Sequence, residues 1–345
     1  MIIDFFFNKQ RPLGSPPIGD LDLMTQQLSI TTLEAYLLKS DPKSSRDQLQ
    51  RVRRIADFIK TQDVAVLQGV WGSNVTPLQD AVSETHTVPP FCAASTLISF
   101  LSYFLNIILF WWCKTGGLWF SYKKSFRQLW YSKHIFSTSI AARSVQAILI
   151  DINSQCSGKY LLIFNTQLDE DENVQAKQVQ EIHKFISDTV SQLNSARRDG
   201  RLPGFDFART GVLLTGDLAM DAGSPSYIKL KSLFVAKDFY SDVRDKKKEG
   251  EQVQKGQTKG KKKTSDEEET ERVDTDSYTY DPSTNDLADG QPMRRDYIFG
   301  LDNYFGSTWH QQFMKLEATE CLIHKTQKSH ELSNHHAVTA TLSFQ

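Results

Sequence analysis

The chain has 345 residues, of which 39% are hydrophobic and 23% charged, and these proportions are typical of a globular protein that can bury a core. Its formal net charge is −1, so no overall basic field attracts nucleic acid, which disfavours a nuclease without excluding a local basic patch. The four cysteines are widely spaced and form no CxxC pair, which argues against a structural zinc site.

An apolar stretch at the start of the chain, Ile2–Phe7, is interpreted as a first strand. Asp4 interrupts it, and neither a basic segment nor a small-residue cleavage site accompanies it. A secretory signal peptide is therefore not supported.

Short apolar runs and amphipathic patterns alternate along the rest of the chain. The runs are typical of buried strands, and the i, i+3, i+4 spacing of apolar residues in two segments is typical of helices. The expected strands are Val64–Leu67, Ala147–Ile152, Tyr160–Asn165, Val212–Leu214, Tyr297–Phe299 and His336–Phe344, and the expected helices are Arg46–Thr61 and Val174–Leu193. This mixture, without an internal repeat, predicts a single α/β or α+β domain over residues 1–345.

Two insertions interrupt this pattern. Residues 88–115 contain Ala93–Cys113, a run of 21 residues without a charge, which is long enough to span a bilayer as a helix. Residues 243–273 have a lysine cluster, then a glutamate cluster, and few apolar side chains, so we predict a disordered loop there. Binding of this loop to an acidic lipid surface is the alternative.

Several motifs follow one another in an order and at a spacing that resemble one superfamily. The segments VAVLQGVWGS (Val64–Ser73), GGLWFSYKKSF (Gly116–Phe126), LLIFNTQLDED (Leu161–Asp171), LLTGDLAMDAGSPSYIKL (Leu213–Leu230) and LSNHHAVTATLSF (Leu332–Phe344) resemble the LQEVW, SGLxxxSKxPI, FNTHLDA, GDFNxxxxSxEYxxL and LSDHYAVxAxL motifs of the endonuclease/exonuclease/phosphatase superfamily. TYDPSTNDLADGQPMRRDYIF (Thr279–Phe299) and RPLGSPPI (Arg11–Ile18) look like its neutral sphingomyelinase branch rather than its abasic-site nucleases.

This resemblance implies an α/β-sandwich of two packed β-sheets with helices on both outer faces and the site at one rim. It also implies metal-dependent hydrolysis of a phosphodiester, which in sphingomyelin releases phosphocholine and leaves ceramide. Such hydrolysis needs a divalent cation to neutralise charge on the phosphoryl group and a base to activate water. The expected cofactor, if the chain is active, is Mg²⁺, which prefers oxygen ligands such as carboxylates.

Five polar residues stand where the resemblance places site residues. His335 is at the position of the base, and Asp296 is at the position of the carboxylate that orients it. Asp217 stands at a metal-ligand position in the GD motif, and Asn165 lies on the strand that frames the site. Asn8 is a candidate for the first-strand asparagine that also serves the metal.

Four other positions depart from the motifs of the superfamily. Gly69 replaces the glutamate that is the principal carboxylate of the metal, and Asn334 replaces an aspartate. Ala219 replaces the asparagine that positions phosphate or water, and Gln167 replaces a histidine. Because the loss of one transition-state donor typically costs ~10²–10³ in rate, we expect weak activity or none. Asp217 would then make only a hydrogen bond at a strand end, and residual metal chemistry is the alternative.

The apolar insertion lies between two strands that must join the same core, so a single membrane crossing would separate the halves of the domain. A re-entrant hairpin or a segment lying on the membrane is compatible with the fold. Its aromatic residues suit a membrane interface, where we expect Phe104, Phe110, Trp111 and Trp112 to bind. A helix packed on the core of the domain is the alternative.

Together these observations predict a membrane-associated, sphingomyelinase-like protein on the cytoplasmic face, weakly active or inactive, that binds lipid headgroups or a protein partner through its cleft. The alternative is a functional Mg²⁺-dependent sphingomyelin phosphodiesterase with a rearranged metal site that uses Asp217, Asp296 and His335. A nuclease is the third possibility, and it is disfavoured because no basic patch with interleaved aromatic residues is visible.

Overall fold

The computed structural model describes residues 27–38, 41–45, 47–89, 117–138, 143–258, 275–304, 312–326, 328 and 330–345. The expected strand Ile2–Phe7, the candidate metal residue Asn8 and residues 90–116 of the apolar insertion lie outside these ranges. The same holds for the aromatic residues expected at the membrane, which are Phe104, Phe110, Trp111 and Trp112.

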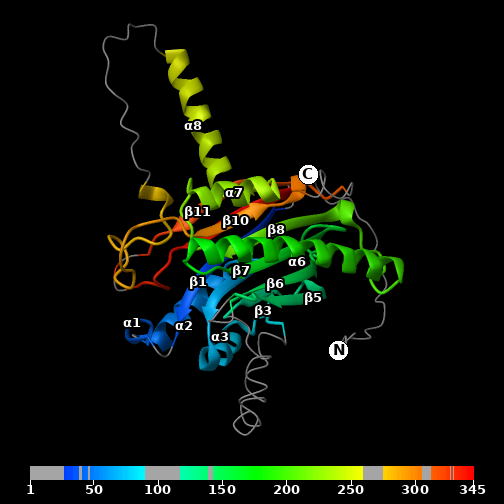
Figure 1. Ribbon diagram of the computed structural model, residues 1–345, viewed down its shortest axis with the longest axis horizontal. Helices are drawn as coiled ribbons and strands as arrows, with labels where there is room; N and C mark the ends of the chain where they lie inside the picture. The colour runs from blue at the N-terminus through cyan, green and yellow to red at the C-terminus, as the bar shows by residue number, and fades with distance from the viewer. Residues whose placement is uncertain are drawn as a thin grey trace.

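Two six-stranded sheets pack face to face in the centre of the molecule (Figure 1). In spatial order the first consists of β11 (Leu316–His324), β12 (Ala337–Phe344), β1 (Gln27–Leu37), β2 (Val64–Val70), β4 (Trp119–Lys123) and β3 (His86–Thr87). The second consists of β5 (Arg127–Ile135), β6 (Ser144–Asp151), β7 (Tyr160–Gln167), β8 (Thr210–Asp217), β10 (Asp296–Gly300) and β9 (Lys237–Asp238). Both sheets are mixed, since β1 pairs with β2 and β7 with β8 in parallel.

Helices cover the outer faces of both sheets. The first sheet carries α2 (Gln48–Lys60) and α3 (Val75–Val82), and the second carries α6 (Glu172–Arg198) and α7 (Pro225–Phe234). Shorter elements are α1 (Pro42–Ser45), η1 (Gly72–Asn74), η2 (Phe207–Arg209) and η3 (Thr275–Ser277). Among the described helices, none combines the length and the apolar character that crossing a membrane requires. The predicted fold class, two packed sheets flanked by helices, is confirmed.

The alternation of side chains along β7 shows how these layers share the core. Leu161 and Ile163 belong to the apolar cluster between the sheets, whereas Leu162 and Phe164 belong to the cluster beneath α6. A strand buried on both faces is expected to divide its side chains in this way. Asn165 continues the inner face, so that a polar side chain enters the space between the sheets close to the end of the strand.

The long helix α6 follows β7 because its start and its apolar face are both encoded locally. The side chain of Asp171 accepts hydrogen bonds from the backbone N–H groups of Asn173 and Val174, which caps the first turn. Ile182 and Ile186, four residues apart, are buried against the second sheet. The helix thus begins soon after β7 ends at Gln167.

Each strand and helix that the sequence predicts within the described residues overlaps an observed element. The strands β1, β3, β5, β9 and β11 were not predicted. The prediction of a disordered loop over residues 243–273 is wrong for residues 243–258, which belong to the helix α8 (Phe239–Thr258). Phe239 and Val243 are buried and anchor this helix, and the lysine, glutamate and glutamine residues that follow are strong helix formers. Residues 259–273 lie outside the described ranges.

Candidate active site

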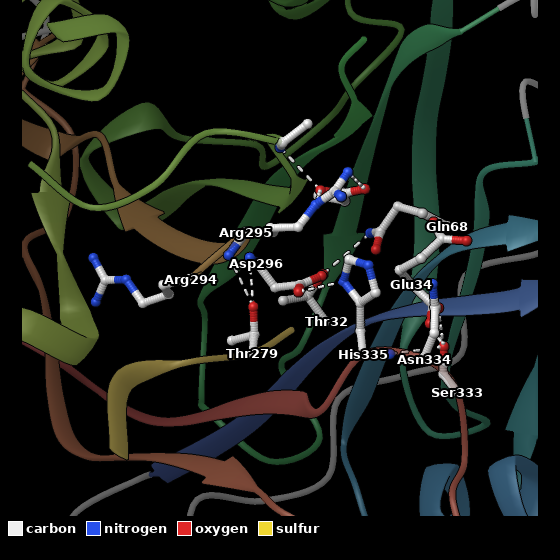
Figure 2. A network of polar contacts seen from close by, with 12 residues as sticks. Thr32, Glu34, Gln68, Thr279, Arg294, Arg295, Asp296, Ser333, Asn334 and His335 are labelled. Atoms are coloured by element: carbon white, nitrogen blue, oxygen red, sulfur yellow. Dashed lines mark hydrogen bonds and ion pairs between the residues drawn. The ribbon is translucent and has the colours of Figure 1, made fainter. Parts of the chain in front are cut away.

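Polar side chains from both sheets converge at one rim of the sandwich, where β7 and β8 end (Figure 2). In the sheet register, Asp217 lies directly opposite Asp296 on one side and Gln167 on the other. The residues of this rim site are Glu34 of β1, Gln167 of β7, Asp217 of β8, Arg295 just before β10, Asp296 at its start, and His335 just before β12.

Asp296 and His335 form a buried pair. Nδ1 of His335 lies 2.7 Å from Oδ2 of Asp296, and the two side chains are 2% and 0% exposed, His335 first. Burial alone would lower the pKa of His335, but the charge of Asp296 and the hydrogen bond between them outweigh it and raise that pKa above its usual value. The structure thus brings together the two residues that the sequence places as base and orienting carboxylate.

Asp217 is bound by a guanidinium group. Nε of Arg295 lies 3.3 Å from Oδ1 of Asp217, and Nη2 lies 3.4 Å from Oδ2, so both carboxylate oxygens face the planar fork of the arginine. Burial would raise the pKa of Asp217, but the positive charges of Arg295 and His335 outweigh it and hold that pKa below its usual value. Asp217 is therefore a paired carboxylate in this site.

Glu34 is a site residue that the sequence analysis missed. Its Oε2 accepts a hydrogen bond of 2.6 Å from Nε2 of Gln167, and the same nitrogen lies 3.4 Å from Oδ2 of Asp217. Gln167 thus joins two carboxylates on facing sheets. Burial, together with the charge of Asp217, raises the pKa of Glu34 to about 7.

The carboxylate of Glu34 occupies the space next to Gly69 on the neighbouring strand. A Cβ atom built on Gly69 would lie 1.8 Å from Oε1 of Glu34 and 3.0 Å from the backbone nitrogen of Tyr36. Gly69 also has a φ of +64°, which disfavours any residue with a side chain. The carboxylate of Glu34 therefore lies where a side chain at position 69 would begin.

We expect Gly69→Ala to lower the free energy of unfolding by about 2 kcal/mol, because it adds a contact with Glu34 to the strain of a left-handed backbone. Gly200→Ala is the matched control, since Gly200 has a φ of +70° and no atom within 4 Å of its Cβ position. Urea denaturation of both variants and of Glu34→Ala/Gly69→Ala measures the contact. Equal losses for Gly69→Ala and Gly200→Ala would show that Glu34 does not fill this space.

The other residues singled out from the sequence lie around the rim site. Asn165 is fully buried between the sheets, where its Nδ2 donates to the carbonyl of Leu67 and its Oδ1 accepts from Gln68, so it joins β7 to β2. Oδ1 of Asn334 accepts a hydrogen bond from Ser333. Ala219 has a φ of +52°, a conformation that asparagine tolerates better, and its N–H donates to Asp217. Asp217 and Ala219 thus form a hydrogen-bonded turn at the end of β8.

A cavity of about 280 Å³ opens beside the rim site, and Arg295 forms part of its wall. The ring of Tyr280 lies between this cavity and the buried pair, 5.4 Å from the guanidinium carbon of Arg295 and 5.1 Å from the ring of His335. The remaining lining residues are Glu170, Asp289, Gln291 and Met293. The cavity thus offers one cationic group, one aromatic ring and two carboxylates.

The loop that carries Tyr280 is tied to the start of β10. Oγ1 of Thr279 accepts hydrogen bonds from the backbone N–H groups of Arg295 and Asp296, at 2.9 and 3.1 Å. Tyr280 and Met293 form a bridge that closes the loop at its base. The sequence analysis did not single out Arg295 or Tyr280, although both lie in the quoted motif that precedes β10.

The arrangement of donors does not fit Mg²⁺. Each oxygen of Asp217 and Glu34 already accepts a hydrogen bond from an N–H group, and the donors are Ala219, Arg295, Gln167 and Tyr36. A hard cation needs such oxygens as ligands and would lie against a guanidinium of the same charge. In the ranges that the structure describes, no cluster of three or more His, Cys, Asp or Glu side chains is arranged to hold a metal ion.

Comparisons with known proteins extend the fold assignment. No protein-family model and no curated protein matches the chain. Among solved structures, the chain is similar to TDP2 of Caenorhabditis elegans, with 16% identity over 94% of this chain and 77% of that one and a TM-score of 0.54. It is similar to D. rerio TDP2 complexed with a single-strand DNA product, with 13% identity over 92% of this chain and 99% of that one and a TM-score of 0.56.

The endonuclease/exonuclease/phosphatase of Bacteroides vulgatus is a further structural neighbour, with 16% identity over 92% of this chain and 99% of that one and a TM-score of 0.57. At this level of identity the likeness concerns the fold. With its two sheets, its flanking helices and its rim site, the chain has the fold of the endonuclease/exonuclease/phosphatase proteins.

Proposed function

We propose that this chain binds phosphodiester headgroups of the phosphocholine type at a membrane surface, and that it hydrolyses them weakly or not at all. The observation that carries the proposal is the cavity beside the rim site. Arg295, which also donates to Asp217 and Glu170, adds a positive charge that suits a phosphate. The ring of Tyr280 suits a quaternary ammonium group, as does the carboxylate of Asp289, which also pairs with Lys43. A headgroup with a negative phosphate and a positive ammonium group therefore complements the charges that line this cavity.

Weak hydrolysis follows from the state of the buried pair. A general base must give up its own proton before it can take one from water. Because the pKa of His335 is raised, its imidazole holds a proton to higher pH than a free histidine does. Asp296 keeps the ring in place through Nδ1, and the backbone N–H of His335 donates to Ser333, so the imidazole is firmly positioned. Because the raised pKa favours its protonated form, any hydrolysis by this base should increase with pH.

The proposed membrane association rests on the amino-acid sequence. The apolar segment Ala93–Cys113 and its aromatic residues Phe104, Phe110, Trp111 and Trp112 suit a membrane interface. Residues 88 and 89 lead from the first sheet into this segment, and Gly117 returns from it to β4. Both ends of the segment thus belong to the same folded domain, which supports a segment that lies on the membrane or re-enters it.

The test measures binding and turnover in one system. We expect the full chain to sediment with sphingomyelin vesicles, free phosphocholine to compete, and phosphocholine release in the presence of Mg²⁺ to stay at background. Metal-dependent release that vanishes in His335→Ala would instead support a functional phosphodiesterase with a rearranged site. Failure to bind the vesicles, with binding to duplex DNA at physiological salt, would overturn the proposal in favour of a nucleic-acid ligand.

A further inference from the structure

We propose that the guanidinium of Arg295 is a resident cation that takes the place of a divalent metal ion at Asp217. It follows that removing Arg295 opens a divalent-cation site whose ligands are Asp217 and Glu34. This inference goes beyond the proposed function, because it concerns the charge balance of the rim site. It does not depend on which headgroup binds, or on whether one binds at all.

The contacts of Arg295 carry the first step. Its side chain is 11% exposed, and its Nε and Nη2 face the two oxygens of Asp217, while Nη1 donates to Oε1 of Glu170 at 2.9 Å. The planar fork of arginine pairs with both carboxylate oxygens at once, so no oxygen of Asp217 is left without an N–H neighbour. A metal ion at Asp217 would have to displace this guanidinium.

The charges of the rim site carry the second step. Asp217, Asp296 and Glu34 are acidic. Arg295 and His335 form ion pairs with Asp217 and Asp296, and the charge of Arg143 also acts on Asp217 and Glu34. The Asp296 charge is matched by His335, and the Asp217 charge is matched by Arg295. Buried carboxylates need such partners, because an unpaired buried charge is costly. Arg295 thus supplies the compensation that a bound cation would otherwise supply.

The position of Glu34 carries the third step. Gln167 Nε2 lies between Oε2 of Glu34 and Oδ2 of Asp217, at 2.6 and 3.4 Å, so an N–H donor stands where a shared cation would bridge the two carboxylates. Gln167 is a neutral donor, whereas Arg295 is charged and is held by two carboxylates. Arg295 is therefore the group that excludes the cation, and Asp217 with Glu34 provides the oxygen ligands that its removal would free.

The experiment titrates Mn²⁺ into the full chain and follows free Mn²⁺ by electron paramagnetic resonance, with thermal unfolding as a second readout. We expect Arg295→Met to bind one Mn²⁺ at least tenfold more tightly than the natural chain does, and its Tm to rise with Mn²⁺. Arg295→Lys keeps a charge beside Asp217 and should bind Mn²⁺ as weakly as the natural chain. Asp217→Asn added to Arg295→Met should abolish the gained site.

Two results would overturn the inference. One is a folded Arg295→Met variant, shown by circular dichroism, that gains no Mn²⁺ affinity. The other is a natural chain that binds Mn²⁺ in a way that Asp217→Asn removes, and this measurement needs no arginine variant to fold. No lipid is present in these titrations. They therefore test the role of Arg295 separately from headgroup binding, and either proposal can fail without the other.

Discussion

Arg294→Met should lower the free energy of unfolding by about 3 to 5 kcal/mol, the cost of leaving one partner of a buried ion pair without its counter-charge. Arg294 and Asp238 are 2% and 1% exposed, and the guanidinium contacts the carboxylate directly. The hydroxyl of Tyr227 donates to the same carboxylate, and the ring of Tyr297 lies 4.6 Å from the guanidinium carbon. Urea denaturation monitored by circular dichroism measures the loss.

Two further variants show that the ion pair is the cause. Arg127→Met removes the same charge from an exposed pair with Asp151, whose arginine is 67% exposed, and it should cost less than about 1 kcal/mol. Arg294→Met/Asp238→Leu removes both charges and should be more stable than Arg294→Met alone, because no buried charge is then left unpaired. If the double variant is the less stable one, packing of the long side chains decides the stability here.

Glu34→Gln should remove a pH dependence of stability of about 2 to 3 kcal/mol between pH 5 and pH 8. The pKa of Glu34 is raised from 4.5 to about 7 in the folded chain, because burial and the charge of Asp217 disfavour its ionised form. Between those two values the folded chain holds a proton that the unfolded chain has lost. The natural chain therefore loses stability as the pH rises through this window, and the glutamine variant does not lose this part.

The quantity to measure is the difference in free energy of unfolding between Glu34→Gln and the natural chain, from urea denaturation at several pH values. This difference should grow in favour of the variant from pH 5 to pH 8. Glu320→Gln is the matched control, since Glu320 is an exposed glutamate on β11. A difference for Glu34→Gln that stays constant with pH would mean that Glu34 is ionised throughout the range.

The sequence allowed the fold to be predicted well because its signals are local and repeated. The apolar runs of β2, β7 and β8 and the capped pattern of α6 each identify an element without reference to the rest of the chain. The first strand was harder. QLSITTLEAYL, the sequence of β1, mixes polar and apolar residues, and its Glu34 lies on the inner face where a buried carboxylate is not expected.

Only those residues of the candidate site that stand in recognisable motifs could be predicted from the sequence. Asp217, Asp296 and His335 stand in recognisable segments, and the structure brings them to one rim. Glu34 and Arg295 could not be assigned to the site, because their roles depend on the register between β1 and β2 and on a side chain that turns back from the start of β10. The helix α8 was missed for a similar reason. It is anchored by Phe239, whose contacts form only in the folded core.

The contact between Glu34 and Gly69 restricts the order in which this site can be rebuilt. A side chain introduced at position 69 would meet the end of the Glu34 side chain and would have to adopt a left-handed backbone, so Glu34 would have to shift to make room. Shortening Glu34 first leaves that space free and leaves only the backbone strain. The order of two such changes therefore decides how much stability the intermediate variant loses.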